Sequence, residues 1–280
     1  MEKQVDQRYL FSADAVALGG QITHPFCDVI DSQASAVLPI TGGHGSARVE
    51  GFRYRELVSF KTASSTVTGN EVKENGNSIF HTLTTVTVEG LNVANVVTAD
   101  AIVARLVSSF DRERGRRVIL PVGSAFVNLR IAGTRIDLPR RRALFESGTL
   151  PDLTSACQRD RKLGSLGEDL ARLQSSGPHS EGTAGRDSAS GPHREQRLLT
   201  CLFDVHGDEG DGHGEERLPA GCGKRGECGI RVPGFGTVFL GEFYITRASR
   251  RLTMLRIEMG CPVHGTVTTN IVGGNGSDYP

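Results

Sequence analysis

The strongest constraint on the fold is a period of two in several short runs of apolar and polar side chains. Every second residue is apolar in Val127–Ile131 (VNLRI) and Leu255–Met259 (LRIEM), and Leu83–Val88 (LTTVTV) is dominated by Thr and Val. Successive side chains of a strand point to opposite faces, and branched side chains favour strands. Residues 10–138 and 232–276, with Gly- and Asn-rich breaks between the runs, are therefore predicted to be β.

The predicted architecture is all-β, with packed antiparallel sheets in a sandwich-like arrangement and a long irregular insert that contains one short helix. A β-solenoid is the alternative, because the pattern apolar-x-Gly-x-x-apolar occurs at Val49–Tyr54, Val88–Val93 and Ile131–Ile136. The three copies are unequally spaced, and simple bends at glycine between two strands explain them equally well. The sandwich is therefore favoured. Thr237–Ile245 (TVFLGEFYI) is apolar on both parities, which predicts a strand covered on both faces.

Residues 139–231 are predicted to be a polar, largely disordered insert that loops out of a single β domain. That domain consists of a first part, residues 10–138, and a completing part, residues 232–276. Ser175–Pro192 contains no Phe, Tyr, Trp, Val, Ile or Leu, so too little apolar surface is present to offset the entropy of ordering. Two apolar stretches interrupt the insert: a leucine pattern over Leu163–Leu173 predicts a short helix, and Leu198–Val205 (LLTCLFDV) can dock onto the β body.

Composition argues against several classes of partner. The chain has 32 basic residues (Lys and Arg) and 32 acidic residues (Asp and Glu), so its formal net charge is zero. No overall positive charge therefore favours binding to nucleic acid or to an anionic membrane. The basic runs Arg112–Arg117 and Arg140–Arg142 are interpreted as solvated turns. No apolar stretch approaches the roughly 18 residues of a transmembrane helix, and the chain has no Trp for stacking on bases. We therefore expect the protein to bind protein partners or to self-assemble. We expect it to bind no nucleic acid and no cofactor and to have no transmembrane segment.

The cysteines and the first residues leave the compartment open. Six cysteines are too few for a disulfide scaffold at this length. A local Cys222–Cys228 bridge and free thiols are both compatible with the sequence. The first residues lack the continuous apolar core of a secretory signal. Either the protein stays inside the cell, or this chain begins after a cleaved leader.

Candidate chemistry is confined to one loop. Four possible metal ligands lie within eight residues, and carboxylate and imidazole groups suit Zn or Mn: His206, Asp208, Asp211 and His213. Their spacing fits neither an EF-hand nor HExxH. No G-x-S-x-G sequence is present, and no catalytic residue is assigned. Asp100 and Glu242 are interpreted as structural strand residues rather than as a catalytic pair.

Three segments, in this order, resemble bacterial proteins of the choice-of-anchor P type. They are Val97–Asp100 (VTAD) followed by Ile102–Ala104, Ser124–Ile131 leading to Ile136–Pro139, and Val232–Val238 followed by Leu240–Glu242. In that family a VTAD strand, a T-x-L-x-V-x-G strand and a PG-x-G-x-V-x-LNE segment follow one another. The resemblance implies an exported protein held at the bacterial surface, without an established activity or catalytic residues to carry over.

The leading hypothesis is a non-enzymatic, bacterial, β-rich structural or surface/adhesion-type protein. The alternative is a metal-binding protein or metal-dependent enzyme that uses the loop 206–213. A third hypothesis is a diverged product whose insert arose by accident. Localisation stays open, and only the resemblance suggests an extracellular or cell-surface location.

Overall fold

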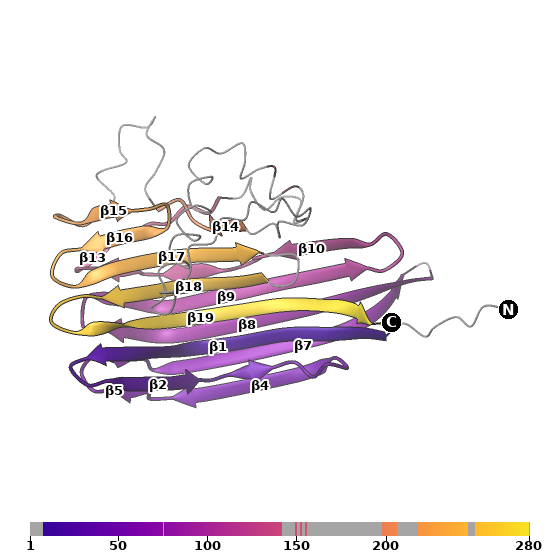
Figure 1. The fold of residues 1–280 in the computed structure, drawn as a ribbon, viewed down its shortest axis with the longest axis horizontal. Helices are drawn as coiled ribbons and strands as arrows, with labels where there is room; N and C mark the ends of the chain where they lie inside the picture. The colour runs from indigo at the N-terminus through magenta and orange to yellow at the C-terminus, as the bar shows by residue number, and fades with distance from the viewer. Residues whose placement is uncertain are drawn as a thin grey trace, which may run out of the picture.

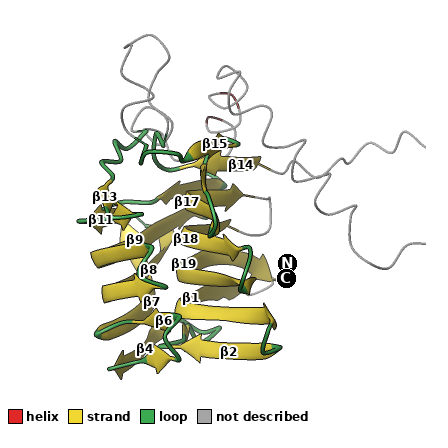
Figure 2. Cartoon of the chain, turned by 90° about the vertical axis from the view of Figure 1, so that its left-hand side faces the viewer, coloured by secondary structure: helices red, strands yellow, loops and turns green. Residues whose placement is uncertain are grey.

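The chain folds into two antiparallel β-sheets that pack face to face (Figures 1 and 2). This computed structural model describes residues 8–74, 76–141, 149, 152, 155, 198–205, 218–245 and 250–279. Over these residues the structure is mostly strand with almost no helix, which confirms the predicted all-β sandwich. None of the helices in the described ranges is both long and apolar enough to cross a membrane.

The first sheet, sheet A, combines the two ends of the chain. Its main path runs β15–β16–β17–β18–β19–β1–β2, while β14 pairs with β17 and β3 pairs with β1. The long first strand pairs with the last one over nearly its whole length, from Arg8 opposite Tyr279 to His24 opposite His264. The strands of sheet A are β1 (Arg8–His24), β2 (Asp28–Gln33), β3 (Ala36–Val37), β14 (Leu198–Cys201), β15 (Gly223–Arg225), β16 (Gly229–Val232), β17 (Gly236–Ile245), β18 (Arg250–Met259) and β19 (His264–Tyr279).

The second sheet, sheet B, is formed by the middle of the first predicted β segment. Strand β8 lies at its centre between β7 and β9, and β10, β11 and β12 follow one another along the outer edge of β9. The strands of sheet B are β4 (Gly43–Glu50), β5 (Arg53–Tyr54), β6 (Val58–Ser59), β7 (Thr62–Glu74), β8 (Asn77–Val93), β9 (Val97–Asp111), β10 (Arg116–Leu120), β11 (Ala125–Val127), β12 (Arg130–Ile131) and β13 (Thr134–Arg135).

The hydrophobic core lies between the central strands of the two sheets. Strands β1, β18 and β19 of sheet A pack on β7, β8 and β9 of sheet B. Alternate residues of β8 and β9 are buried, as the period of two predicts: Val86 and Val88 on β8, Ile102 and Ala104 on β9. Small alanines at alternate positions of β1 are buried in the same core. The first and last predicted β segments therefore share one core.

One polar side chain also joins the two sheets. Asn270 of β19 is fully buried, and its Nδ2 atom donates hydrogen bonds to the carbonyl oxygens of Val86 (3.2 Å) and Ile102 (2.8 Å). Asn270 has a φ of 51°, a left-handed conformation that Asn tolerates better than most residues. Nearby, the hydroxyl of Thr84 donates to the carbonyl oxygen of Gly273 at 3.2 Å. These bonds fix how the sheets are aligned, because a slide of either sheet would break them.

The three repeated glycine motifs mark bends of the sandwich and not solenoid layers. Gly51, Gly90 and Gly133 all have positive φ, at 67°, 65° and 79°. Gly51 follows β4, Gly90 is a left-handed residue inside β8, and Gly133 lies in the turn between β12 and β13. Glycine recurs because it adopts this conformation without the steric cost of a Cβ. The similarity among the three segments is therefore local.

Three strands that begin within residues 139–231 extend sheet A. Strand β14 pairs with β17 over Leu198–Cys201, so the apolar run Leu198–Val205 does dock onto the β body. The hairpin of β15 and β16 adds two strands at the sheet edge. The predicted helix over Leu163–Leu173 and the segment Ser175–Pro192 lie outside the described residues.

The basic run Arg112–Arg117 is not a fully solvated turn. It forms the hairpin between β9 and β10, where the guanidinium of Arg112 lies 4.8 Å from the ring centre of Phe80. Arg117 lies at the same distance from Phe110. Cation–π contacts of this kind explain why the two arginines are half-buried. Two of the arginines therefore stabilise this end of the sandwich.

Candidate functional site

A cleft lies beside β11 and β13, between residues of sheet B and the segment that follows β14. It has a volume of about 710 Å³, which is within the usual range for small-molecule sites. Three chain segments line it: residues 124–128 around β11, residues 134–140 after β12, and Phe203 just after β14. We refer to this feature as the cleft. It joins residues from sheet B to one residue from sheet A.

The cleft has an apolar wall and a polar rim. The rings of Phe126 and Phe203 lie 5.3 Å apart and are tilted by 57°, so each sheet contributes one aromatic side chain. The rim includes Arg135, Arg140 and Asp137, two guanidinium groups against one carboxylate. This balance favours an anionic or strongly polar group on a ligand whose remainder is flat and apolar.

Backbone hydrogen bonds fix the wall between the two sheets. The amide of Arg141 donates to the carbonyl oxygen of Leu202 at 3.0 Å, and the amide of Asp204 donates to that of Pro139 at 2.8 Å. Arg140 and Phe203 form the β-bridge between these bonds. Residues 139–141 leave sheet B and residues 202–204 leave sheet A, so this short pairing connects the layers beside the cleft.

The side chain of Arg141 adds an ionic connection at the same place. Only 13% of this side chain is exposed, and it forms ion pairs with Glu227 (3.4 Å) and Asp204 (3.8 Å). Its Nε atom also donates to the carbonyl oxygen of Phe203 at 3.3 Å. Partly buried pairs of this kind are costly to break, because the remaining charges lose their partner. The prediction that Arg140–Arg142 is a solvated turn is thus wrong at Arg141.

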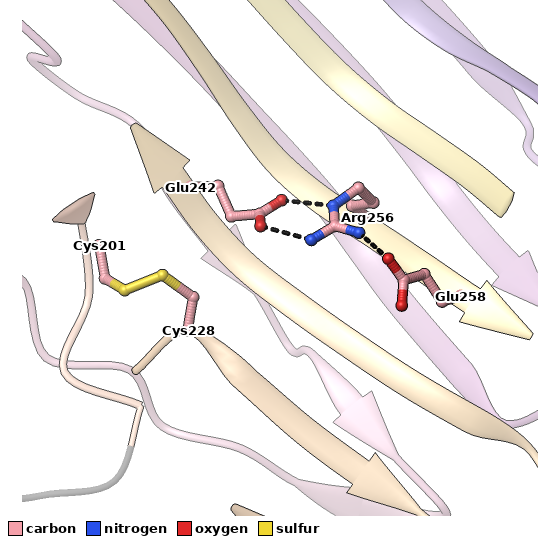
Figure 3. A network of polar contacts seen from close by, with 5 residues as sticks. All are labelled: Cys201, Cys228, Glu242, Arg256 and Glu258. Carbon is pink, nitrogen blue, oxygen red and sulfur yellow. Dashed lines mark hydrogen bonds and ion pairs between the residues drawn. A yellow bond between two sulfur atoms is a disulfide. The ribbon is translucent and has the colours of Figure 1, made fainter. Parts of the chain in front are cut away.

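A disulfide joins the two strands next to this wall. The bond joins Cys201, which ends β14, to Cys228, which immediately precedes β16 (Figure 3). Both side chains are buried. Both strands pair with the same edge of β17, β14 at Glu242–Ile245 and β16 at Gly236–Phe239. The bond therefore staples two strands that meet end to end along one partner. Because Phe203 follows Cys201 by two residues, the staple also holds the aromatic wall of the cleft.

Gly241 provides the bend that makes this meeting possible. It has a φ of 67° and accepts a hydrogen bond from the amide of Leu202 at 2.8 Å. A Cβ at this position would lie 2.6 Å from the Phe203 ring. A side chain here would therefore strain the backbone and displace the ring from the cleft.

The left-handed residue Gly241 corrects the interpretation of β17. The strand was predicted to be covered on both faces because it is apolar on both parities. Instead, the buried parity changes at Gly241 while the register with β18 stays the same, so Val238 and Leu240 before it and Phe243 and Ile245 after it all face the core. The outward side is only half-buried, and no second layer covers it among the described strands.

On this outward side, Arg256 of β18 links several side chains of sheet A. Its guanidinium donates two hydrogen bonds to Glu242, at 2.6 and 2.7 Å, a further one to Glu258, and lies 3.8 Å from the ring centre of Phe239 (Figure 3). Burial lowers the pKa of Arg256, but the bonds and charges of Glu242 and Glu258 outweigh this effect and leave the pKa above its usual value. The group fixes β17 against β18 close to the disulfide.

The structure separates the two carboxylates considered from sequence. Asp100 lies on sheet B and accepts a hydrogen bond from Asn128 Nδ2 at 2.6 Å, whereas Glu242 lies on sheet A and pairs with Arg256. Both therefore have structural partners. The proposed metal ligands lie outside the described residues: His206, Asp208, Asp211 and His213. Within the described ranges, no group of three or more His, Cys, Asp and Glu side chains is placed to hold a metal ion.

The cysteine pairing differs from both alternatives considered from sequence. Cys228 bonds to Cys201, and Cys222 is a half-buried free thiol whose pKa is raised by burial. The hairpin explains why Cys222 is not the partner. Its register sets Gly223 opposite Arg231, so position 222 lies four residues along the strand from Cys228.

Sequence reasoning missed the cleft residues because they come from three separate segments. Ser124 and Phe126 lie in a resemblance segment, but nothing in their spacing indicates that Phe203 lies opposite them. The available signal was the apolar run Leu198–Val205 within a polar region. A docked strand there implies a contact with the β body, although not its location.

The same cleft and staple lie within the part of the chain that matches a known family. One family, described as a domain of unknown function (DUF8256), matches residues 9–246, from β1 to the end of β17. No curated protein and no solved structure shows a significant match. Since the match covers most of its length, the chain belongs to the family described as a domain of unknown function (DUF8256).

Proposed function

We propose that this protein is a non-enzymatic β-sandwich of the bacterial cell surface that binds a ligand or partner in the cleft. The observation that carries the proposal is the stapled cleft wall, in which the disulfide and the Arg141 ion pairs hold Phe203 opposite Phe126. A site that is rigid before its ligand arrives loses less entropy on binding. An adhesive or structural protein needs such a preformed surface.

The staple also supports an extracellular location. Disulfides form and persist in secreted and surface proteins, and they are rare in the cytosol, where thiols are kept reduced. Cys201 and Cys228 are buried and lie on neighbouring ends of two strands. The resemblance to the choice-of-anchor P proteins, which are held at the bacterial surface, points the same way.

The charged groups around the cleft favour recognition over turnover. Arg135 pairs with Asp137, and Asn128 donates to Asp100. Arg141 is held by two carboxylates. A general base needs a carboxylate that is available to accept a proton from a substrate, whereas Asp100, Asp204 and Glu227 already have hydrogen-bond or ion-pair partners. Paired groups of this kind suit the orientation of a ligand.

The export part of the proposal is tested on protein isolated from its native cells. The cells are quenched in acid, free thiols are alkylated, and the peptides are analysed by mass spectrometry. We expect Cys201 and Cys228 to appear as a linked pair and Cys222 to be alkylated. Complete alkylation of all three cysteines would refute the export proposal.

The binding part is tested with aromatic carboxylates such as benzoate, which match the apolar wall and the basic rim. We expect protein-observed NMR shifts to cluster at Phe126, Asn128 and Phe203. The variant Phe126→Ala should abolish them. Leu83→Ala, which removes an exposed apolar side chain elsewhere on sheet B, should leave them unchanged. Shifts scattered over the surface, or none at all, would contradict the proposal.

A further inference from the structure

The outer edge of sheet A beyond β1 is formed by one chain segment, residues 28–40. Strands β2 and β3 lie end to end along β1, and the segment continues with a hydrogen bond from the amide of Phe11 to the carbonyl oxygen of Ile40. No further strand pairs with this segment among the described residues, and β2 lies at the margin of the sheet (Figures 1 and 2). The backbone groups of an edge strand that point away from the sheet are available to another strand.

This edge is unusually apolar for a free sheet margin. Seven large hydrophobic side chains are exposed in the described ranges, and four of them lie on or next to this segment: Phe26, Val29, Val37 and Ile40. Val29, the second residue of β2, is 67% exposed. Edge strands are commonly protected by charge, proline or bulges. An exposed valine on a free edge instead favours pairing.

Only the β2 part of the edge is open. At β3, strand β4 approaches so closely that a Cβ on Gly45 would lie 2.7 Å from the carbonyl oxygen of Val37. At β2, by contrast, the contacts from sheet B are made by side chains: Tyr54 and Arg55 donate hydrogen bonds to the carboxylate of Asp28, at 2.7 and 3.0 Å. Pairing with an additional strand is therefore confined to β2.

The charges on β2 are arranged so that two copies can meet. The hydrogen bond from Tyr54 and that from Arg55 lower the pKa of Asp28, so this carboxylate is satisfied within its own chain. Asp31 is the remaining acidic residue of β2 and is exposed. The guanidinium of Arg55 lies 3.8 Å from the ring centre of Phe26, directly before the strand. One end of the edge therefore carries the Arg55–Asp28 ion pair beside an aromatic ring, and the other end carries Asp31, an acidic residue with no ion-pair partner among the described residues.

We propose that β2 pairs with β2 of a second copy of this chain, antiparallel and about a two-fold axis at Val29. In this register Val29 faces its equivalent, and Asp31 of each copy lies opposite position 27 of the other, beside Arg55 and Phe26. The contact is self-complementary and closes as a dimer. It joins two nine-stranded sheets into one continuous sheet. Because only Asp28–Ile30 of each copy lie opposite strand residues in this register, the dimer is weaker than one with a standard-size interface.

Sedimentation equilibrium over a dilution series of the oxidised protein tests the dimer. We expect a monomer–dimer equilibrium that Val29→Lys weakens on the order of a hundredfold, because a symmetric contact loses two apolar side chains at once. Leu83→Lys, at an exposed apolar residue of sheet B, should have no effect. A single monomeric species at every concentration would overturn the proposal, as would a dimer insensitive to Val29→Lys, which would place the contact elsewhere.

The register is tested by cross-linking. In a chain that also carries Cys27→Ser and Cys261→Ser, Val29→Cys should form an intermolecular disulfide, because residues directly opposite in an antiparallel pair are within bonding reach. Ser32→Cys, also exposed on β2, should not. Efficient cross-linking of Ser32→Cys without that of Val29→Cys would refute the Val29 axis. Capture of a different protein's strand in place of the dimer would refute the choice of partner.

Discussion

Loss of the Cys201–Cys228 bond should destabilise the protein by about 3.5 kcal/mol. The two cysteines are separated by 27 positions. Closing a loop of this length removes roughly 12 cal/mol/K of entropy from the unfolded chain, which corresponds to this free energy at 25 °C. For a domain of this size the melting temperature should fall by about 10 °C.

The assay is calorimetry of the oxidised protein and of three variants, Cys201→Ala, Cys228→Ala and the double variant. The cross-link is lost once in each case, so the two single changes and the double change should cost nearly the same free energy of unfolding. Cys261→Ser, at an exposed free thiol, is the matched control and should melt like the unmodified protein. Costs that add across the two single variants would show two independent buried thiols and refute the staple.

Three further predictions concern the contacts that fix the sheets. Arg256→Ala should lower the free energy of unfolding, measured by chemical denaturation, by about 3 kcal/mol, because the Glu242 side chain is only 14% exposed and loses its guanidinium partner. Arg48→Ala, which breaks an exposed ion pair, should lower it by less than about 1 kcal/mol. Asn270→Ala should cost about 2 to 3 kcal/mol in the same assay, since two buried hydrogen bonds between the sheets are lost. Asp28 has a lowered pKa, so its stabilising contribution is complete above the pKa of the unfolded state and is lost as the pH falls through the pKa of the folded state. Asp28→Asn should therefore make the melting temperature fall less steeply below about pH 4. The same fall in the variant and in the unmodified protein would contradict this.

The strands with a clear period of two were predictable from sequence. On β8 and β9 the pattern gives both the secondary structure and the buried face, because each strand has one face on the core and one outside. Asn270 was not predictable in this way. Its role depends on two carbonyl oxygens that belong to strands more than 160 residues earlier in the chain.

The short strands after residue 139 could not be predicted from their own sequence. Strand β15 (GKR) has no β pattern and is a strand because β16 offers it a partner. Strand β16 in turn pairs with β17, whose edge also receives β14. Pairing with a stable neighbour thus overrides local propensity at this edge.

In the candidate site, too, contacts between distant segments could not be predicted from the local sequence pattern. Asp100 and Glu242, which the sequence placed on separate strands, each form a hydrogen bond to a neighbouring side chain. The pairing of Cys201 with Cys228 was missed, because the bend at Gly241 and the two strands beside it determine which thiols meet. Spacing along the sequence carries no information about such a meeting.

Hydrogen–deuterium exchange resolved by peptide tests the central claim most directly, namely that the N-terminal and C-terminal β segments form one packed body. Strand β1 lies between β2 and β19 of sheet A and packs on sheet B. The amides of β1, β8, β9 and β19 should therefore exchange as one slow group, with a common dependence on denaturant. Exchange of β19 well before β8 and β9, as an independent unit, would contradict the account.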